Sequence, residues 1–289
     1  MHLLKTTLGH ALLLAIAAST AFAQEVPIST LTRSSDPAGR PLWEVGLAGV
    51  GGYVADYPGA AQSRFRGFPV PYFIYRGETL RAGDSGIVRG RFRFSEALEF
   101  DLSFDGSLNA DSDKNTLRRG MPDLDLLGEI GPQIIWRAWT ENDRSITLNL
   151  PIRAMLSFGD GGIRSRGFVL NPRITYRDRA FIGGNTLSLS VGPIFATEKL
   201  MDYFYEIRPQ FALRDRPAFD ADSGYLGSEV SLGLSRRLTP QVRLFVGSQI
   251  GLFSGATNCR STLLARETNW NFALGLSWAI WESSRRSID

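Results

Sequence analysis

A strict alternation of apolar and polar residues is the clearest pattern along the chain. From Leu98 to Asn109, even positions carry leucine, phenylalanine or glycine, and odd positions carry glutamate, aspartate, serine or asparagine. The stretches from Ser145 to Phe158 and from Asn269 to Trp281 repeat this alternation. A period of two is typical of a β-strand with one apolar and one polar face. These three stretches therefore predict long strands.

Five further stretches alternate less regularly and also predict strands. They are Leu124 to Trp139, Arg166 to Asp178, Asn185 to Ala196, Gly227 to Leu238 and Val242 to Phe253. All exceed the roughly five or six residues of a strand in a soluble sheet and reach the roughly 9 to 11 that a tilted strand needs to cross a bilayer. We expect the apolar face to meet lipid and the polar face to line a lumen.

Four prolines lie inside the predicted strands, where proline removes a hydrogen-bond donor from the ladder. They are Pro132, Pro151, Pro172 and Pro193. We interpret them as bulges or local breaks in strand pairing.

The predicted connections separate into a short set and a long set. Turns such as 140–144, 179–184 and 239–241 have six residues or fewer, whereas the connection 197–226 is very long. Outer-membrane barrels alternate short periplasmic turns with longer outer loops, and a soluble β-sandwich does not. The prediction is an all-β fold: a transmembrane antiparallel up-and-down β-barrel of about twelve strands. Ten strands is the alternative, because the stretches 79–82 and 87–94 are short.

The N-terminus has the features of an export signal. Lys5 precedes an apolar run from Leu8 to Ala18, and Ala21, Phe22 and Ala23 form a small-residue cleavage site. We predict a cleaved signal peptide at 1–23, a periplasmic N-terminal segment at 24–41, a barrel at 42–281 and a polar C-terminal tail at 282–289. The tail is expected to hang disordered in the periplasm.

Composition limits the chemistry. The two histidines, His2 and His10, leave with the signal peptide, so mechanisms that need a histidine base are excluded from the mature chain. Cys259 is the single cysteine, which excludes an internal disulfide and disfavours a metal site. Lys+Arg total 32 against 29 Asp+Glu, so a nucleic-acid partner is not indicated. We expect no enzymatic activity and no cofactor.

Charged residues on the polar strand faces are candidates for lining the lumen. They are Glu99, Asp101, Asp105, Asp125, Glu129, Arg153, Arg173, Arg177 and Arg243. Three interpretations stay open. The carboxylates and guanidinium groups form ion pairs that fill or narrow the lumen, they line a selective channel, or paired carboxylates catalyse a hydrolysis. The first is favoured, and catalysis is the weakest of the three.

The longest connection, 197–226, combines aromatic and basic residues. Tyr203, Phe204, Tyr205, Phe211, Phe219 and Tyr225 lie among Arg208, Arg214 and Arg216. One interpretation is contact with lipopolysaccharide phosphates at the outer surface. The other, which we favour, is a loop folded over or into the barrel mouth with its aromatic side chains as an internal core.

From about Trp43 to Ile280 the sequence resembles the MltA-interacting protein / OmpV family of outer-membrane proteins. The resemblance rests on Tyr57-Pro58-Gly59 followed by Pro69, Pro71, Tyr72, Tyr75 and Arg76, on Met121-Pro122-Asp123-Leu124 with Glu129, Gly131 and Pro132, and on Asp202 to Tyr205 ahead of Ser223-Gly224-Tyr225. It departs from the family pattern at Ala60 and at Ser261-Thr262-Leu263. The family has no agreed catalytic residues to carry over.

The resemblance implies a non-catalytic scaffold or envelope-interaction protein in the outer membrane. Its expected partners are outer-membrane lipid, lipopolysaccharide, a lytic transglycosylase and a peptidoglycan synthase. A narrow porin-like channel for small solutes is the alternative function.

Overall fold

The computed structural model describes residues 41–76, 80–82, 89–93, 98–107 and 112–287. The predicted signal peptide and residues 24–40 lie outside these ranges. Thirteen strands are described: β1 Trp43–Ala55, β2 Ser63–Arg76, β3 Leu80–Ala82, β4 Arg89–Arg93, β5 Leu98–Ser107, β6 Leu126–Glu141, β7 Arg144–Gly159, β8 Gly162–Leu170, β9 Arg173–Phe181, β10 Asn185–Ala196, β11 Gly224–Arg237, β12 Val242–Leu252 and β13 Thr268–Glu282.

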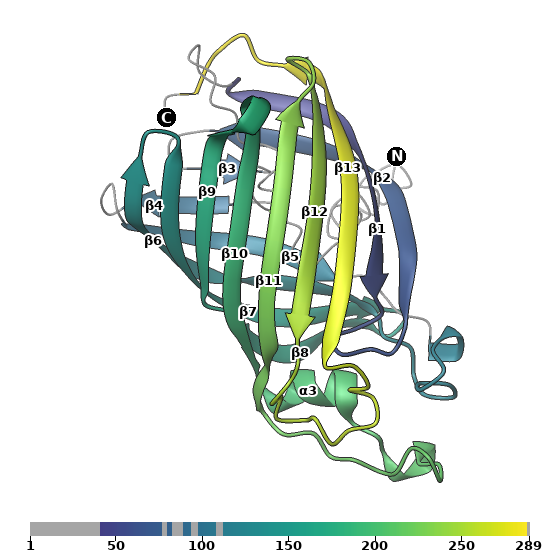
Figure 1. Ribbon diagram of the computed structural model, residues 1–289. Helices are drawn as coiled ribbons and strands as arrows, with labels where there is room; N and C mark the ends of the chain where they lie inside the picture. The colour runs from purple at the N-terminus through teal and green to yellow at the C-terminus, as the bar shows by residue number, and fades with distance from the viewer. Residues whose placement is uncertain (1–40, 77–79, 83–88, 94–97, 108–111, 288–289) are drawn as a thin grey trace, which may run out of the picture.

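The strand pairings run around a ring (Figure 1). Strands that follow one another in the sequence pair antiparallel, except β8 with β9, and β13 pairs with β1. β8 and β9 share one lane, because both pair with β7 on one side and with β10 on the other. Because β8 and β9 together fill one strand position, or lane, the thirteen described strands form twelve lanes around the ring. The predicted all-β architecture is confirmed, and β3 and β4 occupy the two lanes that distinguish twelve from ten.

Burial alternates along the strands as the sequence predicts. On β13, Phe272, Leu274 and Leu276 are exposed, whereas Ala273 and Gly275 between them are buried. The outward face is therefore apolar, and the inward face carries small or polar residues. A soluble sheet has the opposite arrangement, because its apolar face packs on the protein core and its polar face meets water. Among the described residues, no helix is long and apolar enough to cross a membrane.

The long connections gather at one end of the ring, and the described connections at the other end are short. Figure 1 shows helix α3 (Glu198–Tyr205) and the connection before β13 together at the end opposite the start of β1. Three 3-10 turns complete the description, at Ser112–Lys114 (η1), Ile182–Gly184 (η2) and Pro209–Phe211 (η3). We call the end with α3 the capped end and the other the short-turn end.

One expectation about connections is wrong. Residues 159–165, which the predicted strands Ser145 to Phe158 and Arg166 to Asp178 leave as a connection, are mostly strand, because β7 and β8 continue to a tight turn in which Gly159 pairs with Gly162. Gly162 has a φ of 82°, a left-handed conformation that glycine adopts at little cost. The predicted break at Pro172 is confirmed, since it separates β8 from β9.

The C-terminal tail is not free, which corrects the expectation of disorder for its described part. Leu42 donates its backbone N–H to the Arg285 carbonyl at 2.7 Å, and Ser283 donates to the Trp43 carbonyl at 2.9 Å. Pro41 also forms an isolated bridge with Arg286. The tail therefore extends the seam between β1 and β13, because the first residues of the barrel offer it backbone partners.

Candidate functional site

The lumen contains oppositely charged side chains that interact between strands. Arg153 on β7 is buried, lies 3.3 Å from Glu129 on β6 and donates to Gln133 at 3.5 Å. Arg173 on β9 interacts electrostatically with Glu229, which is buried on β11. A buried charge is tolerated when an opposite charge and hydrogen bonds accompany it. These four groups therefore fill lumen space as paired charges.

Uncharged polar side chains continue this lining around the ring. Asn149 on β7 donates to Thr175 on β9 at 3.2 Å, and Thr175 lies 3.0 Å from Ser190 on β10. On the far side, Asn271 on β13 donates to Gln249 on β12 at 3.2 Å. This amide and hydroxyl band satisfies its own donors and acceptors, as a buried polar network must.

A second arginine cluster lies at the short-turn end. Arg76 is almost fully buried and contacts Glu44 at 2.9 Å and the Pro41 carbonyl at 3.0 Å. Arg243 on β12 interacts with Glu44 and Tyr72 in the same region. Arg177 on β9 is half-buried near this end and pairs in register with Ser145 and Ser188.

The remaining sequence candidates lie elsewhere. Asp125 precedes β6 at the capped rim and binds Arg166 at 3.2 Å. Glu99, Asp101 and Asp105 lie on β5 opposite Ile135, Gln133 and Glu129 in register, but their side chains lie outside the described part of the chain. The candidates are thus spread from the short-turn end to the capped rim and do not form one site.

The capped end contains the main hydrophobic core of the described residues. We call the assembly of loop 56–62, loop 112–123, the segment 197–223 and loop 253–267 the cap. Its core includes Tyr57, Met121, Leu200, Met201, Phe204, Tyr205, Ile207, Leu263 and Leu264, and it continues onto inward residues of the strands such as Leu127, Met155 and Leu226. The favoured interpretation of the longest connection, an internal aromatic core at the barrel mouth, agrees with this packing.

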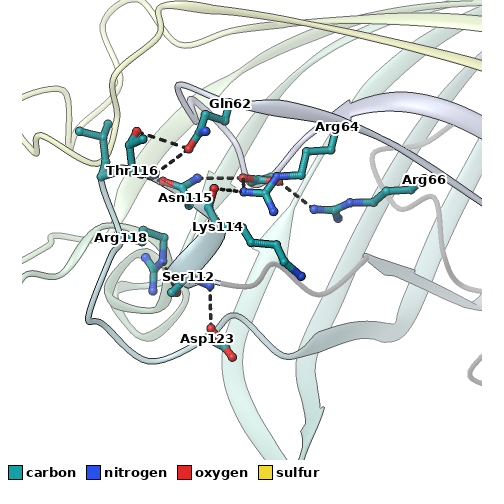
Figure 2. Close-up of polar contacts among 11 residues, drawn as sticks. Gln62, Arg64, Arg66, Ser112, Lys114, Asn115, Thr116, Arg118 and Asp123 are labelled. Carbon is teal, nitrogen blue, oxygen red and sulfur yellow. Dashed lines mark hydrogen bonds and ion pairs between the residues drawn. The ribbon is translucent and has the colours of Figure 1, made fainter.

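A buried carboxylate organises the first cap loop, and Figure 2 labels three residues that contact it, Arg64, Arg66 and Asn115. The Asp56 side chain is fully buried and lies 3.1 Å from Arg64 and 2.9 Å from Arg66, both on β2. Asn115 in the second loop donates to the same carboxylate at 2.8 Å. Asp56 therefore connects the first cap loop, in which it lies, with Asn115 of the second loop, 59 residues later in the sequence. It also connects both loops with the start of β2.

Two buried arginines join the remaining parts of the cap. Arg118 donates to the Phe204 carbonyl at 3.0 Å, and its guanidinium carbon lies 5.6 Å from the centre of the Tyr57 ring. Burial lowers the pKa of Arg118 and raises the pKa of Tyr57. Arg216 donates to the carbonyls of Leu117 and Phe211, each at 2.7 Å.

Sequence reasoning did not single out Asp56 or Arg118. Asp56 directly precedes the Tyr57-Pro58-Gly59 motif, and this adjacency is the one signal that marks it. Arg118 stands in a polar stretch, where a buried arginine and an exposed one look alike. Among the described residues, no group of His, Cys, Asp and Glu has the arrangement of a metal site.

Comparison with known proteins gives one family. The family model of the MltA-interacting protein MipA matches residues 47–280. No curated protein matches the sequence.

Several solved structures share features of the arrangement. The NanC porin is 8% identical, with 81% of this chain and 100% of that chain covered and a TM-score of 0.38. An outer membrane channel from Pseudomonas putida F1 is 11% identical, with 86% and 100% covered and a TM-score of 0.42. The outer membrane phospholipase A from Escherichia coli is 10% identical, with 88% and 98% covered and a TM-score of 0.31.

Proposed function

Since this chain belongs to the MltA-interacting protein MipA family, we propose that it is a non-catalytic scaffold in the outer membrane. Its proposed partners are a lytic transglycosylase, which the family description supports, and a peptidoglycan synthase. The barrel anchors the complex in the membrane, and its short-turn end faces the periplasm, where those enzymes act. Export through a cleaved signal peptide at 1–23 is part of this proposal.

One observation carries the scaffold proposal: the barrel mouth is filled. The cap places Leu200, Met201, Phe204 and Tyr205 in a buried core that continues onto strand residues. Packed protein interiors leave few voids larger than a water molecule. A protein whose chief task is solute passage would leave this mouth open, whereas a scaffold has no need of an open mouth.

The outer surface supports the membrane setting. Exposed apolar residues occur on most of the fully described strands, among them Leu47, Ile134, Leu150, Val191, Leu232, Val246 and Leu274. A monomer in water rarely exposes a contiguous apolar area of this extent. Outer-membrane lipid is the proposed partner of this belt, and lipopolysaccharide the proposed partner of the cap's outer side.

The lumen supports a role without catalysis. The carboxylates of Glu129 and Glu229 are engaged by Arg153 and Arg173, so each has a structural task. The mature chain contains no histidine. We therefore propose that the charged side chains of the lumen pack the barrel interior and do not catalyse a reaction.

A narrow channel for small solutes is the second candidate. The band of polar side chains that includes Asn149, Thr175 and Gln249 supports it, because such a lining accommodates water and small polar solutes. In this alternative the cap opens or leaves a narrow path.

Affinity capture tests the scaffold proposal. The full chain, tagged at its C-terminus and solubilised in mild detergent, is expected to retain a purified lytic transglycosylase and a purified peptidoglycan synthase. An unrelated outer-membrane barrel prepared in the same way is the control. Failure to retain either enzyme above this control would contradict the scaffold role, and discrete channel steps in a planar bilayer would then favour the second candidate.

A further inference from the structure

Two buried arginines of the cap form no ion pair within the described residues. Arg118 in loop 112–123 and Arg216 in segment 197–223 expose only 4% and 5% of their surface. Backbone carbonyls accept most of their hydrogen bonds, and the charge of Arg216 acts on that of Arg118. A buried charge is normally accompanied by an opposite charge. The cap therefore keeps two neighbouring positive charges without an ion-pair partner.

Arg216 holds a turn of its own segment against the loop that contains Arg119. Leu213 and Arg216 close this turn with two backbone hydrogen bonds of 2.8 and 3.1 Å. The guanidinium group donates back to the Phe211 carbonyl at 2.7 Å. It also donates across to the carbonyls of Leu117 and Arg119, at 2.7 and 3.1 Å. One buried side chain therefore fixes the position of the turn on the loop.

Two exposed arginines flank this contact. Arg214 lies within the turn, and Arg119 supplies one of the carbonyls that Arg216 binds. The side chains of Arg119 and Arg214 are exposed, and neither has a hydrogen bond or ion pair with a described residue. Arg208 of the same segment differs, because it contacts Glu206 at 3.1 Å. Two guanidinium groups are thus available at the surface beside the buried pair.

The acidic residues nearby do not cancel this charge. Asp123 acts electrostatically on Arg118, but it is exposed and accepts the Ser112 N–H at 2.6 Å, as Figure 2 shows. Loop 112–123 and the turn 213–216 together contain five basic residues and three acidic ones: Lys114, Arg118, Arg119, Arg214 and Arg216 against Asp113, Asp123 and Asp215. An excess of positive charge remains where the two segments meet.

We propose that Arg119 and Arg214 form a site for the phosphate groups of lipopolysaccharide on the outer side of the cap. A guanidinium group presents its N–H donors in a planar fork that matches a phosphate group. Arg118 and Arg216 strengthen the attraction, because buried charges are screened less by salt than exposed ones. The proposal names the residues of the lipopolysaccharide contact in the proposed function and rests on the outward orientation of the cap.

Binding of purified lipopolysaccharide to the full chain in detergent tests the site. The dissociation constant is measured by thermophoresis, with the same lipopolysaccharide stripped of its phosphate groups as the second ligand. R119Q/R214Q is expected to weaken binding of the intact ligand roughly tenfold. R164Q/R260Q is the matched control, because Arg164 and Arg260 are also exposed at the capped end. Equal effects of the two double variants, or equal wild-type affinity for the two ligands, would overturn the proposal.

Inorganic phosphate is the probe that separates the lipid from a free anion. Lipopolysaccharide is expected to raise the unfolding temperature of the wild-type chain and to raise that of R119Q/R214Q less. Inorganic phosphate at the same phosphate concentration is expected to leave both temperatures unchanged. An equal increase with inorganic phosphate in the wild type would overturn lipopolysaccharide as the ligand of this site.

Surface labelling separates a failure of the site from a failure of the orientation. Cys259 is exposed in loop 253–267 of the cap, so a membrane-impermeant maleimide is expected to label the full chain on intact cells. C259S is the control for this reaction. Absence of labelling would contradict the outward orientation and, with it, the proposal. Labelling together with equal effects of the two double variants would overturn the site and leave the orientation and the scaffold role standing.

Discussion

Arg118 lies over the ring of Tyr57, with its guanidinium carbon 5.6 Å from the ring centre. The Tyr57 hydroxyl donates to the Leu263 carbonyl at 2.9 Å, and Arg118 donates to the Phe204 carbonyl at 3.0 Å. Through this one contact and its two hydrogen bonds, four connections that are far apart in the sequence meet. Such contacts between loops hold the cap together at the mouth of the barrel.

Replacing Arg118 with alanine is expected to loosen the cap. The change removes a cation–π contact and a charged hydrogen bond inside a buried region, at a cost of about 3 kcal/mol in the free energy of unfolding the cap. Limited proteolysis of the detergent-solubilised protein should then cut within 197–223 much faster. R119A is the control, because Arg119 is exposed; equal cleavage of both variants would contradict the role of Arg118.

The cap should be more stable at mildly acidic pH, because of Asp202. Burial, followed by the nearby charges of Glu206 and Glu198, raises the pKa of Asp202 to about 6. Since the folded cap then binds this proton more tightly than the unfolded chain, its stability falls as the pH rises through about 6. The protection factors of the α3 amides, which are exchange rates corrected for the intrinsic pH dependence of amide exchange, should be larger at pH 5 than at pH 7, and D202N should reduce this difference. An unchanged pH dependence in D202N would rule out Asp202 as its cause.

A charge at the middle of the outward face should impair assembly. Leu274 is 56% exposed on β13, and an arginine there costs roughly 2–4 kcal/mol near the bilayer midplane. L274R is expected to lower the amount of heat-modifiable protein, the form that migrates differently on a detergent gel before and after boiling. W281R is the control on the same face, near the rim, where the cost is roughly 0–1 kcal/mol. Equal yields of the two variants would argue against a lipid-facing β13.

Removing the residues after Glu282 should weaken the closing seam without abolishing the barrel. The truncation deletes the backbone hydrogen bonds of Leu42 and Trp43 with the tail, whereas the longer register between β1 and β13 remains. A loss of about 1–2 kcal/mol is expected, at roughly 1 kcal/mol for each hydrogen bond. Urea unfolding of the purified protein in detergent measures it. A midpoint identical to that of the full chain would restore the earlier expectation of a free tail.

The strands could be predicted because each carries its own signal. The alternation in Asn269 to Trp281 reports directly which residues face outward, and β13 follows it residue by residue. Pro172 likewise marks a break in the sequence that the structure confirms. Where the signal is a property of one stretch, no knowledge of the rest of the chain is needed.

The cap could be predicted only in outline. The aromatic residues of 197–226 indicated a core at the mouth, but the partner of each buried charge comes from a distant segment. Asp56 meets Asn115, and Arg216 meets the Leu117 carbonyl 99 residues earlier. Such pairs leave no periodic pattern in a single sequence. For the same reason, the sequence could not show that the charged lumen candidates are spread along the barrel and do not form one site.

Single-channel recording tests the central claim, that the cap closes the barrel, most directly. The purified wild-type chain in a planar lipid bilayer is compared with a variant in which residues 199–222 are replaced by a short glycine–serine linker. The account predicts few or no openings from the wild type and discrete, reproducible steps from the variant, because the linker removes α3 and with it Leu200, Met201, Phe204 and Tyr205 from the mouth. Wild-type steps as frequent and as large as those of the variant would contradict it.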